Sequence, residues 1–310
     1  MVNQPAISVK NLNKIYGKNS LSEKVALDDI NLNIPRGSIF GLLGPNGAGK
    51  STFINILADL VKKTSGEINV LGVDQERDLK KVKSLMGIVP QELNIDPFFT
   101  PYELLEIQAG LYGVSRKNRK TSQILEMLSL SDKSQTYART LSGGMRRRLL
   151  IAKAMVHDPE ILILDEPTAG VDVELRSNLW NNIYLLRSKG KTIILTTHYL
   201  HEAEELCDTI AIIDKGKLLA CDTKENIKSF INNKKITIRY RAKNNFNISE
   251  LKKLNLSVEY NENYIFINYI PHKIEFDKIL QKVSNSGIEV IDMNIKDVNV
   301  EDVFLKLTKT

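Results

Sequence analysis

The residues with the clearest chemical capability lie in one glycine-rich segment, Gly44-Pro-Asn-Gly-Ala-Gly-Lys-Ser-Thr52. Its glycines allow successive backbone N–H groups to point into one concave nest that suits an anion. Lys50 can bring a mobile ammonium group to the β- and γ-phosphates of a nucleotide, and the Ser51 hydroxyl can ligate Mg²⁺. The segment therefore predicts phosphate binding. The residues expected at the nucleotide are Gly44, Pro45, Asn46, Gly47, Ala48, Gly49, Lys50, Ser51 and Thr52.

Two adjacent carboxylates, Asp165 and Glu166, supply chemistry that a bound phosphate needs. They follow the apolar run Ile161-Leu-Ile-Leu164, which would deliver them to the carboxyl edge of a parallel sheet, where ligands bind. Asp165 is placed to hold the Mg²⁺ shell, and Glu166 to orient or deprotonate an attacking water. An Asp-Glu pair alone is better explained as a helix cap, but the phosphate loop in the same chain favours the catalytic interpretation.

The elements that must position these residues belong to an α/β domain. Ser38-Ile-Phe-Gly-Leu-Leu43 is a continuous apolar run, typical of a buried parallel strand, and a helix is expected over residues 50–60. Because strand, loop, Lys-Ser and helix coincide, phosphate binding is favoured over a glycine turn with a capping lysine. Residues 101–141 have a helical pattern and predict an insert in this domain. Further strands are expected at residues 7–13, 29–34, 67–71, 86–91, 161–164, 192–197, 210–213 and 218–220.

The chain is expected to hold two domains. The first spans residues 1–230, with a helical subdomain at about residues 92–150, and a polar linker follows at residues 232–235. The second, residues 236–310, is predicted to be a small α+β domain. Its expected strands cover residues 236–240, 256–260, 264–270 and 289–294, and its expected helices cover residues 275–283 and 299–309.

Composition is that of a soluble globular protein, with 42% hydrophobic and 26% charged residues in 310. The net charge of +6 favours a lysine-rich solvated surface, although attraction to ATP, nucleic acid or an anionic membrane face stays open. The two cysteines, Cys207 and Cys221, form no metal-ligand pattern and suit a reducing compartment. No targeting segment and no apolar stretch of membrane-spanning length is recognised, so any membrane role requires another polypeptide.

The segment Leu141-Ser-Gly-Gly-Met145 resembles the signature of ABC transporter ATPases, which is usually LSGGQ. The order of motifs is similar to that family over about residues 5–225. The resemblance implies that Tyr16 stacks on adenine, that Gln91 senses the γ-phosphate and Mg²⁺, and that His198 contacts the γ-phosphate. Taken singly, each of these three residues would have an ordinary structural explanation. Ala169-Gly-Val-Asp172 resembles the family's loop that contacts the opposing protomer.

Methionine at position 145 departs from the family's pattern. In the family, the serine and the glycine backbone of the signature bind phosphate at a helix N-terminus, and here those residues are Ser142, Gly143 and Gly144. The expected fold class is therefore a phosphate-loop ABC cassette with a mixed sheet and a helical subdomain, followed by the small α+β domain. ATP and Mg²⁺ are the expected cofactors. The expected catalytic residues are Lys50, Glu166 and His198, and the expected metal ligands are Ser51, Gln91 and Asp165.

The sequence segments around these motifs are similar to those of bacterial type-2 ABC exporters, whose cassette and permease are separate chains. This resemblance implies a head-to-tail homodimer, because the family's signature closes over nucleotide held by a second cassette. It also implies integral-membrane permease subunits as partners, no nucleic-acid partner, and a peripheral position on the cytoplasmic face of the membrane. The alternatives are a soluble ABC ATPase that acts on ribosomes or nucleic acid, and a non-catalytic regulatory cassette. A single cassette without a long coiled coil argues against the first, and intact Lys50, Asp165, Glu166 and His198 argue against the second.

Overall fold

The computed structural model describes residues 4–18, 22–168, 173–229, 234–242, 247, 256–269, 274–297 and 300–308. The chain divides into two compact units, residues 1–224 and residues 225–310. The loop predicted at Ala169-Gly-Val-Asp172 lies outside the described residues.

An antiparallel sheet of four strands forms one layer of the first unit. Its order is β2-β1-β4-β5, and its strands are β1 (Ile7–Tyr16), β2 (Lys24–Ile34), β4 (Ser65–Val70) and β5 (Val73–Asp74). Alternate side chains are buried at Ile7 and Val9 of β1 and at Ile68 and Val70 of β4, as in a half-buried strand. Strand β2 begins earlier than the alternating pattern indicated, because Lys24 pairs with Tyr16 at the far end of β1. This pairing brings Tyr16 beside the start of β2.

A mixed sheet of six strands forms the second layer, in the order β10-β9-β3-β8-β7-β6. The strands are β3 (Ile39–Leu43), β6 (Met86–Val89), β7 (Ile161–Asp165), β8 (Thr192–Thr197), β9 (Thr209–Asp214) and β10 (Lys217–Thr223). Only β10 runs antiparallel to its neighbour, and the other pairings are parallel. All five residues of β3 are buried, as expected for a central parallel strand. The predicted mixed sheet is therefore confirmed.

One hydrophobic core joins the two sheets through helix α1 (Lys50–Leu57). It contains Phe53 of this helix, Ile30 of the antiparallel sheet and Ile194 of the mixed sheet. The prediction that this helix reaches residue 60 is wrong. Asp59 takes the left-handed conformation with φ 58°, which stops the helix, and Leu60 is 76% exposed. The first unit also contains the helices α2 (Leu79–Leu85), α6 (Val173–Ser188) and α7 (Leu200–Leu206), and α8 (Lys224–Ser229) begins at the unit boundary.

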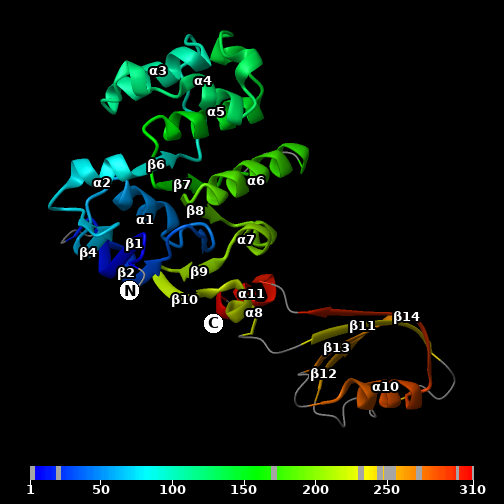
Figure 1. The fold of residues 1–310 in the computed structure, drawn as a ribbon. Coiled ribbons are helices and arrows are strands. Elements are labelled where there is room, and N and C mark those ends of the chain that lie inside the picture. The colour runs from blue at the N-terminus through cyan, green and yellow to red at the C-terminus, as the bar shows by residue number, and fades with distance from the viewer. Residues whose placement is uncertain are drawn as a thin grey trace. The chain divides into compact units, whose positions relative to one another are not determined.

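The predicted helical insert is present between β6 and β7, and Figure 1 shows its helices gathered on one side of the mixed sheet. The insert holds α3 (Pro101–Leu111), α4 (Thr121–Met127) and α5 (Gly143–Met155), with 3₁₀ turns η1 (Arg116–Asn118), η2 (Ser131–Lys133) and η3 (Ala138–Thr140). A capping box starts α3, because the Glu103 N–H donates to Thr100 Oγ1 and the Thr100 N–H donates to Glu103 Oε2. Ser142 caps α5 in the same way through one bond.

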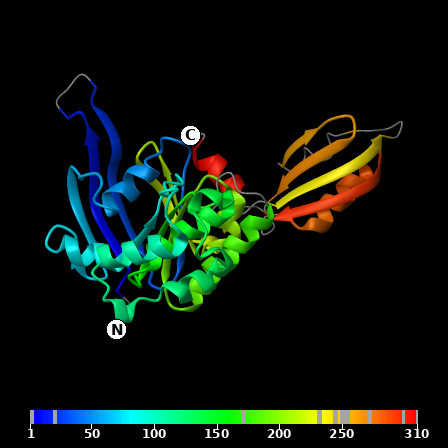
Figure 2. The same ribbon diagram turned by 90° about the horizontal axis from the view of Figure 1, so that it is seen from above.

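The second unit is a small α+β domain, as predicted. Its antiparallel sheet has the order β12-β13-β11-β14, made of β11 (Lys234–Ala242), β12 (Ser257–Tyr260), β13 (Tyr264–Tyr269) and β14 (Ile288–Asp297). Helices α10 (Phe276–Asn285) and α11 (Val300–Thr308) complete it. Figure 2 shows α10 along one face of the sheet, where Ile279 and Val283 join Ile236 and Ile238 in a separate core.

Candidate active site

The glycine-rich loop joins the carboxyl end of β3 to the start of α1. Two of its glycines are required by packing. A Cβ on Gly44 would lie 2.3 Å from the Ile213 carbonyl oxygen, and a Cβ on Gly49 would lie 2.7 Å from the Ala26 carbonyl oxygen. Gly47 has open space around it but a φ of 82°, which favours glycine. The loop is therefore held close to the sheet below while its backbone can face a ligand above.

Lys50 follows the loop and is almost fully buried, with 6% of its surface exposed. Its ammonium donates to the carbonyl oxygens of Gly44 at 2.7 Å and Pro45 at 3.2 Å. Burial lowers the pKa of Lys50, while the charges of Glu166 and Asp165 act in the opposite direction. The side chain predicted as a mobile cation is thus folded against its own loop, at the place where an anion would meet the N-terminus of α1.

A cavity of about 530 Å³ opens above the loop, a size that suits a nucleotide. Ten of the predicted site residues line it, together with Lys24 and Ala26, which the sequence did not indicate. Tyr16 is 38% exposed, with the Lys14 ammonium 4.6 Å from the centre of its ring. The ten predicted residues are Tyr16, Asn46, Gly47, Gly49, Lys50, Ser51, Thr52, Gln91, Glu166 and His198.

The acidic pair stands at the end of β7, and neighbouring strand β8 fixes its backbone. Glu166 has a φ of 46°, a left-handed conformation that is uncommon for a side chain of this kind. Its N–H donates to the carbonyl oxygen of Thr196 at 3.2 Å and to Thr196 Oγ1 at 3.0 Å. The same hydroxyl donates to Asp165 Oδ1. Fully buried Thr196 therefore braces both carboxylates. The sequence analysis missed it, because threonine is an ordinary strand residue.

The Glu166 carboxylate is held between two predicted partners. Gln91 Nε2 donates to Glu166 Oε2 at 3.0 Å, and His198 Nδ1 lies 3.1 Å from Glu166 Oε1. Only 9% of Glu166 is exposed, and it faces the cavity that the phosphate loop forms. An oriented carboxylate beside a phosphate-binding nest can accept a proton from water, provided that water reaches the cavity.

Arg147 of α5 fixes the backbone of the glutamine segment and was also missed. Its Nη1 donates to the carbonyl oxygens of Pro90 at 3.0 Å and Gln91 at 2.9 Å, and the side chain is buried. The sequence offers three consecutive arginines here and no signal that distinguishes the buried one.

The remaining predicted residues do not line the cavity. Gly44, Pro45 and Ala48 lie within the loop itself, and Asp165 lies beside Glu166 under the Thr196 hydroxyl. The signature residues Ser142, Gly143 and Gly144 lie at the N-terminus of α5. Ser142 Oγ accepts from the Met145 N–H at 3.3 Å, while Ser142 and Gly143 are exposed. The structure therefore does not bring the signature to the phosphate loop of the same chain.

The residues at the cavity fit Mg²⁺ only when phosphate oxygens accompany it. Ser51, Gln91 and Glu166 offer oxygen atoms in the cavity, with Asp165 adjacent. Among the described residues, no group of three or more His, Cys, Asp or Glu could hold a metal ion. Mg²⁺ commonly takes one or two carboxylates, water and substrate phosphates, so this sparse donor set is compatible with it.

A buried parallel strand, a glycine nest that opens a helix and an adjacent acidic pair define a phosphate-loop nucleoside triphosphatase. Residues 27–169 match the family model described as ABC transporter. The chain is 33% identical to the linearmycin resistance ATP-binding protein LnrL of Bacillus subtilis, over 97% of this chain and 98% of that protein. This chain belongs to the ABC transporter family, as an ATP-binding cassette.

Other relatives carry related names. The daunorubicin resistance ATP-binding protein DrrA3 of Streptomyces coeruleorubidus is 32% identical over 98% of this chain and 96% of its own length. The Nod factor export ATP-binding protein I of Ralstonia nicotianae is 38% identical over 70% of this chain and 66% of its own length. Several relatives therefore align with nearly the whole chain, the second unit included.

Solved structures match most of the chain. An ATP-binding subunit of an ABC transporter aligns with 73% of this chain and 92% of its own, with a TM-score of 0.65 and 27% identity. A dimeric cassette in a post-hydrolysis state, with bound ADP and Pi, aligns with 70% of this chain and 98% of its own, with a TM-score of 0.62 and 28% identity. The fold is thus that of an ABC ATPase. In the described part of this chain, every helix is too short or too polar to cross a membrane.

Proposed function

We propose that this chain is the ATP-hydrolysing subunit of a membrane exporter and that Glu166 is its general base. The observation that carries the proposal is the Glu166 carboxylate, bonded to Gln91 and facing His198 at 3.1 Å, in the cavity above the phosphate loop. The names of the relatives, which concern drug resistance and export, support the coupling to transport. No observation favours a soluble role on ribosomes or nucleic acid.

Each residue of the cavity has a proposed task. The loop backbone and Lys50 bind the phosphates of ATP, and Lys50 exchanges its bonds to the loop carbonyls for bonds to phosphate oxygens. Ser51, Gln91 and Asp165 would hold Mg²⁺, which when bound neutralises charge on the phosphates. Glu166 accepts the proton of the attacking water, His198 contacts the γ-phosphate, and Tyr16 stacks on the adenine. The exposed face of Tyr16 is compatible with stacking.

A second copy of the chain would complete each site. Ser142 and its two glycines form an exposed helix N-terminus that has no phosphate loop of its own chain in contact. Such a terminus attracts phosphate. We infer a head-to-tail homodimer in which the α5 N-terminus of one copy covers the nucleotide of the other. The dimeric cassette among the similar structures supports association of two cassettes.

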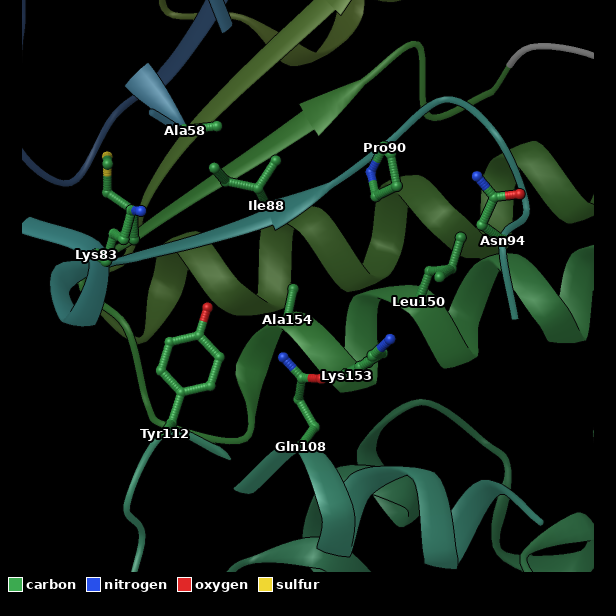
Figure 3. Close-up of a pocket in the computed structure, with 11 residues that line it drawn as sticks. Ala58, Lys83, Ile88, Pro90, Asn94, Gln108, Tyr112, Leu150, Lys153 and Ala154 are labelled. Atoms are coloured by element: carbon green, nitrogen blue, oxygen red, sulfur yellow. The ribbon is translucent and has the colours of Figure 1, made fainter. Parts of the chain in front are cut away.

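A cavity beside the glutamine segment offers a docking place for a separate permease (Figure 3). It has a volume of about 380 Å³ and lies between the end of β6 and helices α3 and α5. Gln108 of α3 and Tyr112, the residue after α3, border it together with Lys153 and Ala154 of α5. Docking here would place the chain on the cytoplasmic face of the membrane.

Glu166→Gln tests the proposed base. Turnover of ATP by the purified chain should fall roughly 10²–10⁴-fold, the usual contribution of a positioned general base, while ATP remains bound. Turnover is measured as phosphate release and binding as retained labelled nucleotide. Glu160→Gln is the matched control, because Glu160 is exposed and precedes the same strand. Undiminished turnover in Glu166→Gln would remove the base assignment, and loss of nucleotide binding in that variant would show a binding role instead.

A further inference from the structure

Glu202 is a buried acidic residue for which the proposed mechanism has no task. It lies in the first turn of α7, four residues after His198, and only 2% of its surface is exposed. Burial raises the pKa of this carboxyl. Burying a carboxyl lowers the stability of the fold unless hydrogen-bond partners are well placed around it.

The contacts of Glu202 reach three segments around the catalytic residues. Trp180 of α6 directs its indole Nε1 to Glu202 Oε1 at 3.4 Å. The hydroxyls of Thr197 and Thr168 lie close enough to lower the pKa of Glu202 against the effect of burial. Thr197 directly precedes His198, and Thr168 lies two residues after Glu166. The carboxyl therefore sits where the strand of His198, the segment of Glu166 and helix α6 meet.

Glu202 and its neighbours also shape the turn that presents His198. The Glu202 N–H donates to the Tyr199 carbonyl oxygen at 3.1 Å, which begins α7. The Tyr199 N–H donates to Thr197 Oγ1 at 2.9 Å, which closes the turn around His198. The Tyr199 ring lies 4.2 Å from the His198 ring, and the Arg176 guanidinium lies 5.5 Å from the Tyr199 ring. His198 therefore lies in a turn that is held by hydrogen bonds and ring contacts of Thr197, Tyr199 and the start of α7.

Two buried polar atoms of the cluster formed by Glu202, Trp180, Thr197 and Thr168 have no hydrogen-bond partner among the described residues. The Thr168 hydroxyl lies near the Glu202 carboxyl, but Glu202 Oε2 and Thr168 Oγ1 make no hydrogen bond to each other or to another described residue. A buried polar atom without a partner is costly, so the cluster has capacity for a tighter arrangement. Such capacity is common at catalytic sites before the substrate binds, because hydrogen bonds tighten in the reacting complex.

We propose that Glu202 is a positioning residue for ATP hydrolysis, because it ties α6 to the β8–α7 turn and so holds His198 against Glu166. Glu202 is buried and does not line the cavity above the phosphate loop, so it would act through the turn. The inference rests on the proposed function, since it concerns the geometry of that same site. A misplacement of a catalytic group by about 1 Å can cost about 10²-fold in rate, so a support of this kind has a measurable effect.

The test compares steady-state ATP hydrolysis by the full chain and four variants. Glu202→Ala and Trp180→Phe should lower kcat by about 10- to 100-fold, because each removes one partner of the bond between α6 and α7. KM for ATP should stay within about threefold, because the phosphate loop is untouched. Glu202→Gln should recover kcat to within about threefold of the wild type, since its amide oxygen still accepts from the indole. Glu205→Ala, the same substitution on the exposed side of α7, should change neither constant.

A double variant separates positioning from general damage. If Glu202 and Trp180 act through one bond, the combination of Glu202→Ala and Trp180→Phe should be no slower than the slower single variant. Multiplied defects, or a folded Glu202→Ala with kcat within about twofold of the wild type, would overturn the inference. Where Glu202→Ala fails to fold, Trp180→Phe decides by the same criterion. A wild-type chain that hydrolyses no ATP would instead refute the proposed function.

Discussion

Glu166 occupies a backbone conformation that costs free energy and that the surrounding strands maintain. A non-glycine residue with a φ of 46° costs on the order of 1–3 kcal/mol, and such residues cluster at active sites. The two bonds that its N–H makes to Thr196 offset this cost and aim the carboxylate at Gln91 and His198.

Residues like Lys50 and Glu166 could be predicted from sequence, because each lies within a short motif of recognisable residue types and spacing. Thr196 and Glu202 could not, because their partners lie about 20 to 30 residues away.

The pH dependence of stability should report on buried Glu202. Because its pKa is raised in the folded chain, the carboxyl stabilises the fold fully below its ordinary pKa of 4.5, and this contribution is lost as the pH rises through the raised value. Glu202→Gln stays neutral and should escape this loss. Its unfolding temperature relative to the wild type should therefore increase from about pH 5 to about pH 8, as measured by scanning calorimetry. A difference that shrinks over this range would mean that the carboxyl is ionised and well paired.

At the scale of elements, helix α5 connects two functions through consecutive arginines. Arg147 is buried and bonds the carbonyls of Pro90 and Gln91, whereas Arg148 bonds the carbonyls of Leu128 and Ser129 inside the helical insert. The helix that begins with the signature thus holds the backbone of the glutamine that contacts Glu166.

Strands such as β3 were predictable from their continuous apolar runs. The end of α1 at Leu57 and the early start of β2 were not, because a backbone conformation and a strand partner decide them.

Replacement of these two arginines should separate catalysis from stability. Arg147→Met should lower ATP turnover by about tenfold, since it releases the Gln91 backbone and leaves two carbonyls unpaired, at a cost of about 1–3 kcal/mol in unfolding free energy. Arg148→Met should lower the unfolding free energy by a similar amount with little change in turnover. Phosphate release and denaturant unfolding measure the two quantities. Equal losses of turnover in both variants would show that Arg147 has only a structural role.

At the scale of the whole molecule, the N-terminus of α5 and the phosphate loop do not meet within one chain. Ser142 is exposed and does not line the cavity that holds Lys50 and Glu166. In the homodimer that we propose, a second cassette would complete the site, with the same pair of surfaces used twice around a twofold axis. The resemblance in sequence already suggested this arrangement. One chain alone cannot display it, because the proposed contact would lie between copies.

The mass of Glu166→Gln in solution tests this account most directly. With ATP present, light scattering should give about twice the 35.0 kDa of one chain, and without nucleotide it should give one chain. Adding Ser142→Arg to the same variant should return the mass to that of one chain even with ATP, since the new side chain fills the phosphate position at α5. A mass near 35.0 kDa for Glu166→Gln at saturating ATP would contradict a site shared by two copies.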